Sequence, residues 1–240
     1  MSPLRLAYKT EALALLVAAL LPLTAVADGP PLTVDFKRAP VGSWAEYTVK
    51  VGPAGNLMMK TRWAFLARNA QSNTVELTME GPAAATPEIG GKIVTRMVLL
   101  PDPIGAGKPF RQIVVQLADR EPQDIPVDMP GLPQQKFQNP DPKKLVDRPT
   151  ITVPAGTFST GHYRDVLPDS VVDSWLSDRV PPLGVVKIVS TPRPDTVGPG
   201  GKPMPPVTME LLANGKDARP AITRPVQPFD PGGPGGGAKK

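Results

Sequence analysis

The residues best suited to chemistry gather in one stretch, TVPAGTFSTGHYRDV, residues 152–166, which holds the single histidine of the chain, His162. Asp165 and Asp169 follow it closely, which raises the question of a metal or catalytic site. A metal site normally draws on several histidines or cysteines, and this chain has one histidine and no cysteine. The alternation of small, aromatic and polar residues is typical of a strand. We therefore predict no metal and no cofactor, and expect His162→Ala to leave ligand binding unchanged.

Serine chemistry is the second possibility, because GTFSTG, residues 156–161, resembles the nucleophile elbow of serine hydrolases. That elbow needs glycine two residues before and two after the serine, but Thr157 stands two before Ser159. The Gly-Lys pairs of the chain lack the upstream glycine and the following Ser or Thr of a phosphate-binding loop. No pair of carboxylates stands out for sugar hydrolysis. We predict that the protein is not an enzyme, and a hydrolase remains the third alternative.

Six adaptable apolar side chains form a different candidate site. Methionine is flexible and polarizable, so a face rich in methionine suits ligands of variable shape, such as acyl chains. The alternative is that these residues fill a core, since core filling is the commonest use of methionine. On the strand pattern described next, all six face the same interior: Met59, Trp63, Phe65, Met79, Met97 and Met209.

Strands must position these residues, because 33 prolines leave little room for long helices. The runs WAEYTVKV, from Trp44, and LMMKTRWAFLAR, from Leu57, alternate apolar with polar residues, and a glycine-proline turn joins them. Similar runs are TVELTME, KIVTRMVLL, RQIVVQLA, GVVKIVS and VTMELLA, with further strands around Phe158 and Trp175. The sequence thus predicts an all-β domain with few or no helices, in which nine or ten strands form one meandering antiparallel sheet.

Both ends of the chain are expected to lie outside this sheet. Residues 1–27 carry a basic start, the apolar run ALALLVAALLPL and a small-x-small site before Asp28, which together predict a secretory signal peptide. Its uncharged stretch is shorter than the roughly 20 residues of a membrane-spanning helix. We therefore expect no transmembrane helix after the signal peptide is cleaved. The alternative is that the segment is not cleaved and anchors the protein in the membrane. Residues 28–219 would form the β domain. Residues 220–240, rich in proline and glycine, would be a disordered tail.

Composition narrows the function further. An exported chain without cysteine must depend on a buried core rather than on disulfides. The formal charge of +5 is dispersed, and the lysine pairs are too short to form a nucleic-acid-binding stripe. We therefore expect no nucleic-acid partner. Residues 122–142 form a long proline-punctuated connection, which indicates a functional loop or a lid.

The stretch VPAGTFSTGHYR followed by DSWLSDRVPPLGVVKI resembles the C-terminal half of uncharacterised exported bacterial domains similar to the LolA/LolB-like lipoprotein carriers. The match covers residues 153–190, and residues 44–118 in general pattern only. The resemblance implies a single curved antiparallel sheet, a half-barrel, whose concave apolar face holds lipid tails, in the periplasm or at the outer membrane. The carriers use helical lids, whereas here only residues 122–142 could provide cover.

The expected function is that of a non-enzymatic, exported protein of the bacterial cell envelope, periplasmic or secreted. Its expected partner is a lipid acyl chain or a lipoprotein, bound on the concave apolar face. The alternative is a structural or interaction protein of the envelope, with a filled core and with the tail as its working surface.

Overall fold

A computed structural model describes residues 36–52, 57–82, 91–129, 137–197 and 203–229. Within these residues, twelve strands form one sheet in the order β14-β6-β5-β4-β3-β2-β1-β13-β12-β11-β10-β7, and β8 and β9 form a separate hairpin. One 3-10 turn, η3 (Pro142–Lys144), precedes β7. The strands are β1 (Trp44–Val51), β2 (Leu57–Arg68), β3 (Asn73–Glu80), β4 (Lys92–Leu99), β5 (Phe110–Leu117), β6 (Gln123–Ile125), β7 (Leu145–Asp147), β8 (Thr150–Val153), β9 (Gly156–Ser159), β10 (Gly161–Val166), β11 (Ser170–Leu176), β12 (Val185–Pro192), β13 (Val207–Gly215) and β14 (Gln227–Pro228).

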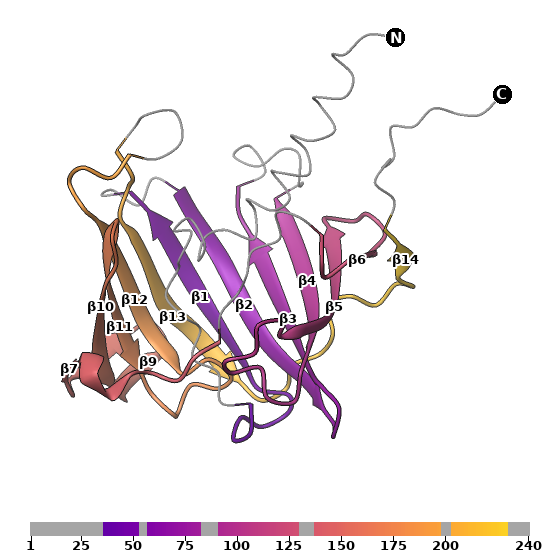
Figure 1. The fold of residues 1–240 in the computed structure, drawn as a ribbon, viewed down its shortest axis with the longest axis horizontal. Helices are drawn as coiled ribbons and strands as arrows, with labels where there is room; N and C mark the ends of the chain where they lie inside the picture. The colour runs from indigo at the N-terminus through magenta and orange to yellow at the C-terminus, as the bar shows by residue number, and fades with distance from the viewer. Residues whose placement is uncertain (1–35, 53–56, 83–90, 130–136, 198–202, 230–240) are drawn as a thin grey trace, which may run out of the picture.

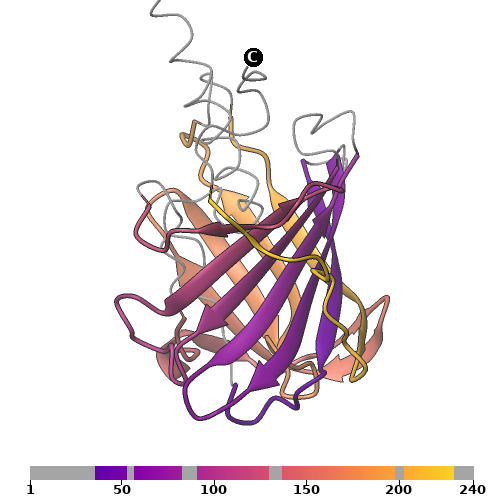
Figure 2. The same cartoon turned by 90° about the vertical axis from the view of Figure 1, so that its right-hand side faces the viewer.

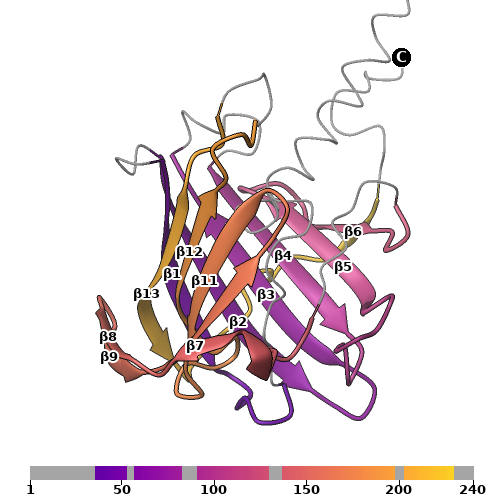
Figure 3. The same ribbon diagram turned by 60° about the vertical axis from the view of Figure 1, so that its left-hand side comes forward.

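The predicted fold class is confirmed: the protein is all-β, with one curved sheet that does not close into a barrel. All neighbouring strands of this sheet run antiparallel except the β14–β6 pair, which is parallel. The strands from β1 to β6 meander in one direction, and those from β13 back to β10 meander in the other. Both halves meet at the β1–β13 pair, near the middle of the sheet in Figure 1. The sheet curls so strongly that β10 to β12 face β2 to β5 across the interior (Figure 3).

The alternation seen in the sequence places one face of each long strand in the core. Ala45, Tyr47 and Val49 of β1 are almost fully buried, while their neighbours in the strand are more exposed. Buried residues of both halves of the sheet belong to one cluster, in which Phe65 and Leu211 are completely covered. The Tyr47 hydroxyl donates to the carbonyl oxygen of Val185 at 3.2 Å, which ties β1 to the start of β12. Burial raises the pKa of Tyr47, so this hydroxyl stays protonated and keeps its role as donor.

Aromatic rings from outside the long strands cover part of the concave face. Phe36, which precedes β1, lies 5.2 Å from the ring of Phe65 between centroids and 6.4 Å from that of Phe137. Phe137 in turn meets Phe110 edge-on at 6.1 Å. Both Phe36 and Phe137 are buried in the main core cluster. We call these two residues, Phe36 and Phe137, the aromatic cover.

The connection predicted over residues 122–142 is only partly a loop. Its beginning forms β6, which adds a strand to the sheet beside β5, and Phe137 belongs to the aromatic cover. Residues 130–136 lie outside the described part of the chain. The prediction of a loop or lid is therefore wrong for residues 123–125, which form a strand. Three residues between prolines are too few to show an alternating pattern in the sequence.

The segment after β13 corrects a second expectation. Residues 220–229, predicted to begin a disordered tail, instead cross the outer face of the sheet, as the yellow ribbon in Figure 2 shows. Ile222 is 3% exposed and packs on Val94 and Val114, and β14 pairs with β6. We call residues 220–229 the C-terminal strap. A few specific contacts hold the C-terminal strap on the sheet. Because the strap has few apolar residues, its composition alone predicted disorder.

The remaining terminal predictions fall outside the described residues. These are the signal peptide, residues 1–27, and the last part of the tail, residues 230–240. Where the structure is described, it contains no helix with the length and apolar character needed to span a membrane.

Candidate functional site

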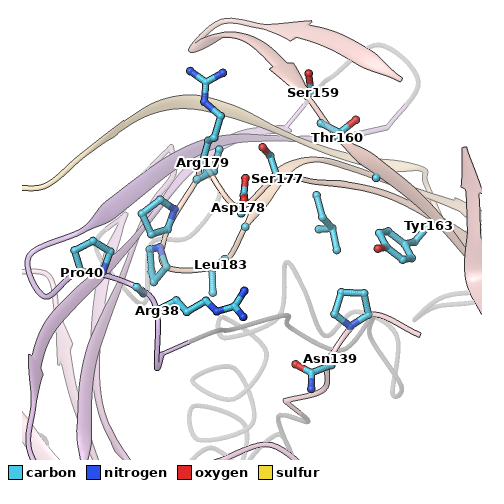
Figure 4. A pocket seen from close by; sticks show the side chains of 18 of the residues that line it. Arg38, Pro40, Asn139, Ser159, Thr160, Tyr163, Ser177, Asp178, Arg179 and Leu183 are labelled. Atoms are coloured by element: carbon cyan, nitrogen blue, oxygen red, sulfur yellow. The ribbon is translucent and has the colours of Figure 1, made fainter. Parts of the chain in front are cut away.

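A cavity of about 780 Å³ lies at the end of the sheet where β10 and β11 meet the loop that leads to β12. Its walls come from distant parts of the chain: residues 38–40 before β1, residues 139–140, Arg148, residues 159–161, Tyr163, residues 176–184 and Lys216. In Figure 4, Arg38 and Tyr163 point toward a common central space and Asn139 lies at its edge, whereas Arg179 points away from it. Segments that lie far apart in sequence therefore build one concave site.

The apolar wall of the cavity is the edge of the protein core. Ala39, Val180 and Leu183, which line the cavity, are members of the main core cluster, and Leu176 packs against that cluster. Tyr163 adds an aromatic face, since its ring lies against Gly161, where a Cβ atom would come within 2.9 Å of the tyrosine Cε2. Glycine at position 161 thus leaves room for the ring beside the cavity.

The six apolar residues predicted to bind a ligand come together, but deeper than expected. Five of them are buried members of the main core cluster, and Met59 packs against it. All six are described by the structure, and none of them lines the cavity. They share the cluster with the apolar wall of the cavity, so the predicted set and the observed cavity are parts of one interior. Their role in ligand binding stays a prediction: Met59, Trp63, Phe65, Met79, Met97 and Met209.

Three polar atoms on this interior face lack a hydrogen-bond partner. They are the hydroxyls of Thr61 and Thr95 and the indole Nε1 of Trp63, and each of these residues is at most 3% exposed. Trp63 and Thr95 both pair with Leu77 of β3 in the sheet register, so their strands flank the same point of β3. None of these three residues lines the cavity, so they belong to the core beside it.

Arg38 is positioned by a second arginine. The guanidinium of Arg68 donates to the carbonyl oxygen of Lys37 at 3.2 Å and to that of Ala39, so it holds the backbone on both sides of Arg38. Arg68 itself lies over the ring of Phe65, 5.2 Å from its centroid. The end of β2 therefore fixes the segment that carries Arg38 at the mouth of the cavity.

Lys216 is brought to the same place by the β1–β13 pair. Gly42 has a φ of +87°, and a Cβ atom on it would come within 2.7 Å of the Lys216 carbonyl oxygen, so glycine allows the close approach of these two backbones. The amide of Ala218 donates to the carbonyl oxygen of Gly42 at 2.8 Å. The Trp44 indole donates to Asp217 at 2.7 Å, and this hydrogen bond holds the pKa of the Asp217 carboxyl below its usual range.

The remaining walls are fixed by short-range hydrogen bonds. The amide and the hydroxyl of Thr160 both donate to the carbonyl oxygen of Pro149 at 2.9 Å, which holds the chain next to Arg148. In the loop of residues 177–184, the amide of Ser177 donates to the Gly184 carbonyl oxygen, and the amide of Gly184 donates to that of Val180, each at 2.7 Å. The cavity is thus formed by loops whose backbones are internally bonded.

Positive charge dominates the lining of the cavity. Arg38, Arg148, Arg179 and Lys216 line it, against a single acidic side chain, Asp178. The hydroxyls of Ser177 and Tyr163 and the amide of Asn139 add neutral hydrogen-bonding groups. The composition favours a ligand that presents both an apolar part and a polar or negatively charged part.

His162 lies on the opposite, outer face of the sheet and does not line the cavity. Its Nδ1 lies 3.1 Å from Asp147 and its Nε2 lies 2.7 Å from Asp173, while its ring stacks on Trp175 at 4.5 Å. Arg164 donates to Asp173 at 2.8 Å. Both ring nitrogens are therefore engaged with carboxylates. Among the described residues, no group of three histidines or acids is arranged to hold a metal ion.

Asp173 is the central acceptor of this outer cluster. Burial alone would raise the pKa of its carboxyl, but hydrogen bonds from Arg164 and His162 outweigh burial and hold the pKa below its usual value of 3.8. The neighbouring carboxylate is Asp147, which contacts the other side of His162. The cluster joins β7, β10 and β11 at the end of the sheet.

We expect Asp173→Asn to reduce the acid sensitivity of the fold. A carboxyl whose pKa is lower in the folded chain stabilises it above the unfolded pKa, and this contribution disappears as the pH falls through the folded pKa, here below 3.8. The substitution should cost less than about 1 kcal/mol at neutral pH, because Arg164 is half exposed. Urea unfolding at a series of pH values measures the effect, with the exposed Asp128→Asn as control. Parallel stability curves for the wild type and Asp173→Asn would contradict it.

No model of a protein family matches the chain, and no curated protein matches it in sequence. Three solved structures are similar in backbone. A hypothetical protein of Chlamydia trachomatis has 12% identity and a TM-score of 0.45, over 77% of this chain and 91% of its own. A candidate exported protein with a YmcC-like fold from Bacteroides fragilis has 11% identity and a TM-score of 0.33, over 78% and 100%. A candidate lipoprotein of Parabacteroides distasonis has 13% identity and a TM-score of 0.35, over 78% and 100%. These scores assign no ligand and no activity to the present chain.

Proposed function

We propose that the protein is an exported, non-enzymatic binding protein of the cell envelope that holds an amphipathic ligand of the lipid type. The observation that carries this proposal is the cavity of about 780 Å³, whose apolar wall belongs to the core and whose rim is polar. Ligand-binding cavities are commonly about 300 to 1,000 Å³ and combine apolar walls with a few polar groups. The signal peptide predicted for residues 1–27 supports export.

The arrangement of nucleophiles and bases supports a non-enzymatic role. Ser159 and Ser177 line the cavity, but His162 lies on the other face with both nitrogens engaged by carboxylates. A serine nucleophile needs a base within hydrogen-bond reach. The geometry therefore favours binding over hydrolysis.

The test is to fill the mouth of the cavity. Asn139 is exposed and lines the cavity at its edge, so Asn139→Trp should fold normally and block the ligand. Its matched control is Gln138→Trp, which changes the exposed neighbour that does not line the cavity. With delipidated protein and a fluorescent acyl probe, we expect binding to wild type and to Gln138→Trp and a loss of at least about tenfold in Asn139→Trp. Equal binding by the two variants, or no binding by wild type, would refute the proposal.

A second candidate is an interaction protein with a filled core. The observation that favours it is the aromatic cover, because Phe36 and Phe137 are buried in the same core cluster as most of the predicted methionine set. The acyl probe separates the two candidates, because a binding protein takes it up and a protein with a filled core does not. Deletion of residues 231–240 leaves the C-terminal strap intact; a binding protein keeps its acyl probe after this deletion, whereas an interaction protein that uses the tail as its working surface loses its protein partner.

A further inference from the structure

We infer that Tyr163 is the specificity-determining residue of the cavity, and that its ring sets the length of the apolar tail that the cavity accepts. This inference rests on the proposed function and names a property of the ligand at the same site. It depends on three features of the described residues: the contact of the ring with Gly161, a bulge in the neighbouring strand β7, and the place of the ring near the edge of the sheet.

The first feature is the contact between Tyr163 and Gly161, which lie two residues apart in β10. Both residues line the cavity, and the Tyr163 side chain points toward the central space in Figure 4. A Cβ atom at position 161 would lie 2.9 Å from Cε2 and 3.3 Å from the hydroxyl oxygen of Tyr163. Any larger residue at position 161 would therefore force the ring to move, because the space is already filled.

The second feature is a bulge in β7. This strand pairs with β10 through Asp147 and through Leu145, which lies opposite Tyr163, so Val146 is left between the two pairs. A bulge leaves one residue unpaired and changes the direction of its neighbours. Val146 is 53% exposed, whereas the Leu145 Cδ1 lies 3.4 Å from the position that a Cβ atom would take at Gly161. Leu145 and the Tyr163 ring therefore both lie over Gly161.

The third feature is the order of these side chains near the edge of the sheet. The strand order of the described sheet ends with β7, which carries Leu145. Leu145 does not line the cavity, whereas Tyr163 does. Leu176, part of the apolar wall, lies opposite Gly161 in the register of β10 and β11, so this wall leads to the ring. The Tyr163 ring thus stands between the cavity and Leu145.

These features predict how affinity depends on the length of the tail. A tail that lies along Leu176 and Leu183 would meet the Tyr163 ring. Each further methylene that is buried strengthens binding about fourfold, so affinity should rise with chain length until the tail reaches the ring and should then stop rising. Without the ring, affinity should continue to rise, because Leu145 offers further apolar surface. We call the chain length at which the affinity stops rising the limiting chain length.

The experiment compares probes that share one head and differ in chain length. Delipidated mature protein is titrated with octanoate, decanoate, dodecanoate, tetradecanoate and hexadecanoate below their micelle concentrations. Tyr163→Phe should keep the limiting chain length of the wild type, because it keeps the ring. Tyr163→Ala should raise the affinity for the next chain of the series, relative to the limiting chain, by at least about tenfold. The matched control is Val166→Ala, at an exposed position of the same strand that does not line the cavity, and it should behave as the wild type.

Gly161→Ala is a second test, which keeps the tyrosine. The added Cβ atom displaces the ring, so the limiting chain length should change. In the Tyr163→Ala background the same substitution should have no further effect, because no ring remains to be displaced. A wild-type affinity that rises through the whole series, or one limiting chain length shared by the wild type, Tyr163→Ala and Gly161→Ala, overturns the inference and keeps the proposed function. Binding of no chain by the wild type overturns both.

Discussion

Glu76→Gln is expected to lower the free energy of unfolding by about 3 kcal/mol, because removal of one partner from a buried ion pair leaves the other charge uncompensated. The Glu76 carboxylate is 2% exposed and accepts from Arg96 at 2.7 and 2.9 Å. It also accepts from the amides of Ala221 and Ile222 at 2.6 and 3.3 Å, while Arg96 donates to the Ile222 carbonyl oxygen. One carboxylate therefore holds both β4 and the C-terminal strap, and a neutral amide cannot satisfy all four donors.

Two further measurements identify the cause of this loss. Hydrogen exchange of the Ile222 amide should accelerate in Glu76→Gln, because the C-terminal strap loses its acceptor. The double variant Glu76→Leu with Arg96→Met should recover part of the stability, since it removes both charges. Urea unfolding provides the free energies. A loss below about 1 kcal/mol in Glu76→Gln, with unchanged exchange at Ile222, would show that the strap does not depend on this contact.

Phe36→Ala should destabilise the protein by about 3 kcal/mol, the usual scale for truncating a buried phenylalanine. Phe36 is 3% exposed and lies between the rings of Phe65 and Phe137. Its loss also opens the aromatic cover above the methionine-rich interior, so an apolar dye should bind more strongly to the folded variant. Chemical unfolding and dye fluorescence below the unfolding transition measure the two effects.

Phe36→Leu is the matched control, because leucine keeps most of the apolar volume but not the ring contacts. We expect it to lose less than half as much stability as Phe36→Ala and to bind little extra dye. If Phe36→Ala loses stability without any gain in dye binding, the interior beneath the cover is filled, and the interaction protein becomes the better candidate.

The fold could be predicted largely from strand periodicity. The alternation of β1 matches its burial residue by residue, since Ala45, Tyr47 and Val49 face the core. In β2 the same rule failed at Ala67, which is exposed because a register shift between Phe65 and Ala67 breaks the alternation. The C-terminal strap was missed because a single isoleucine, Ile222, anchors it among prolines and polar residues. Short strands such as β6 and β14 have too few residues to show a period.

The candidate site was predicted only in part. Strand periodicity predicted that the six apolar residues lie on the inward face of the sheet. The structure agrees, because five of them are buried in one core cluster and Met59 packs against it. The cavity cations could not be found in this way, because Arg38, Arg148 and Lys216 lie in turns and loops where no spacing rule applies. What brings Lys216 to residues 38–42 is the pairing of β1 with β13, which unites the two ends of the domain. The sequence could therefore have indicated the position of Lys216 only if the pairing of β1 with β13 had been predicted first.

The central position of β1 in the sheet also determines when its strand pairs can form during synthesis of the chain. Trp44–Val51 is synthesised early, but one of its two neighbours is Val207–Gly215, the last long strand to be made. Until that strand arrives, β1 ends a partial layer whose free amides and carbonyls can recruit other chains. Truncated translation products that stop before residue 207 will therefore be prone to aggregate, because the sheet cannot be completed until nearly all of the chain has been made.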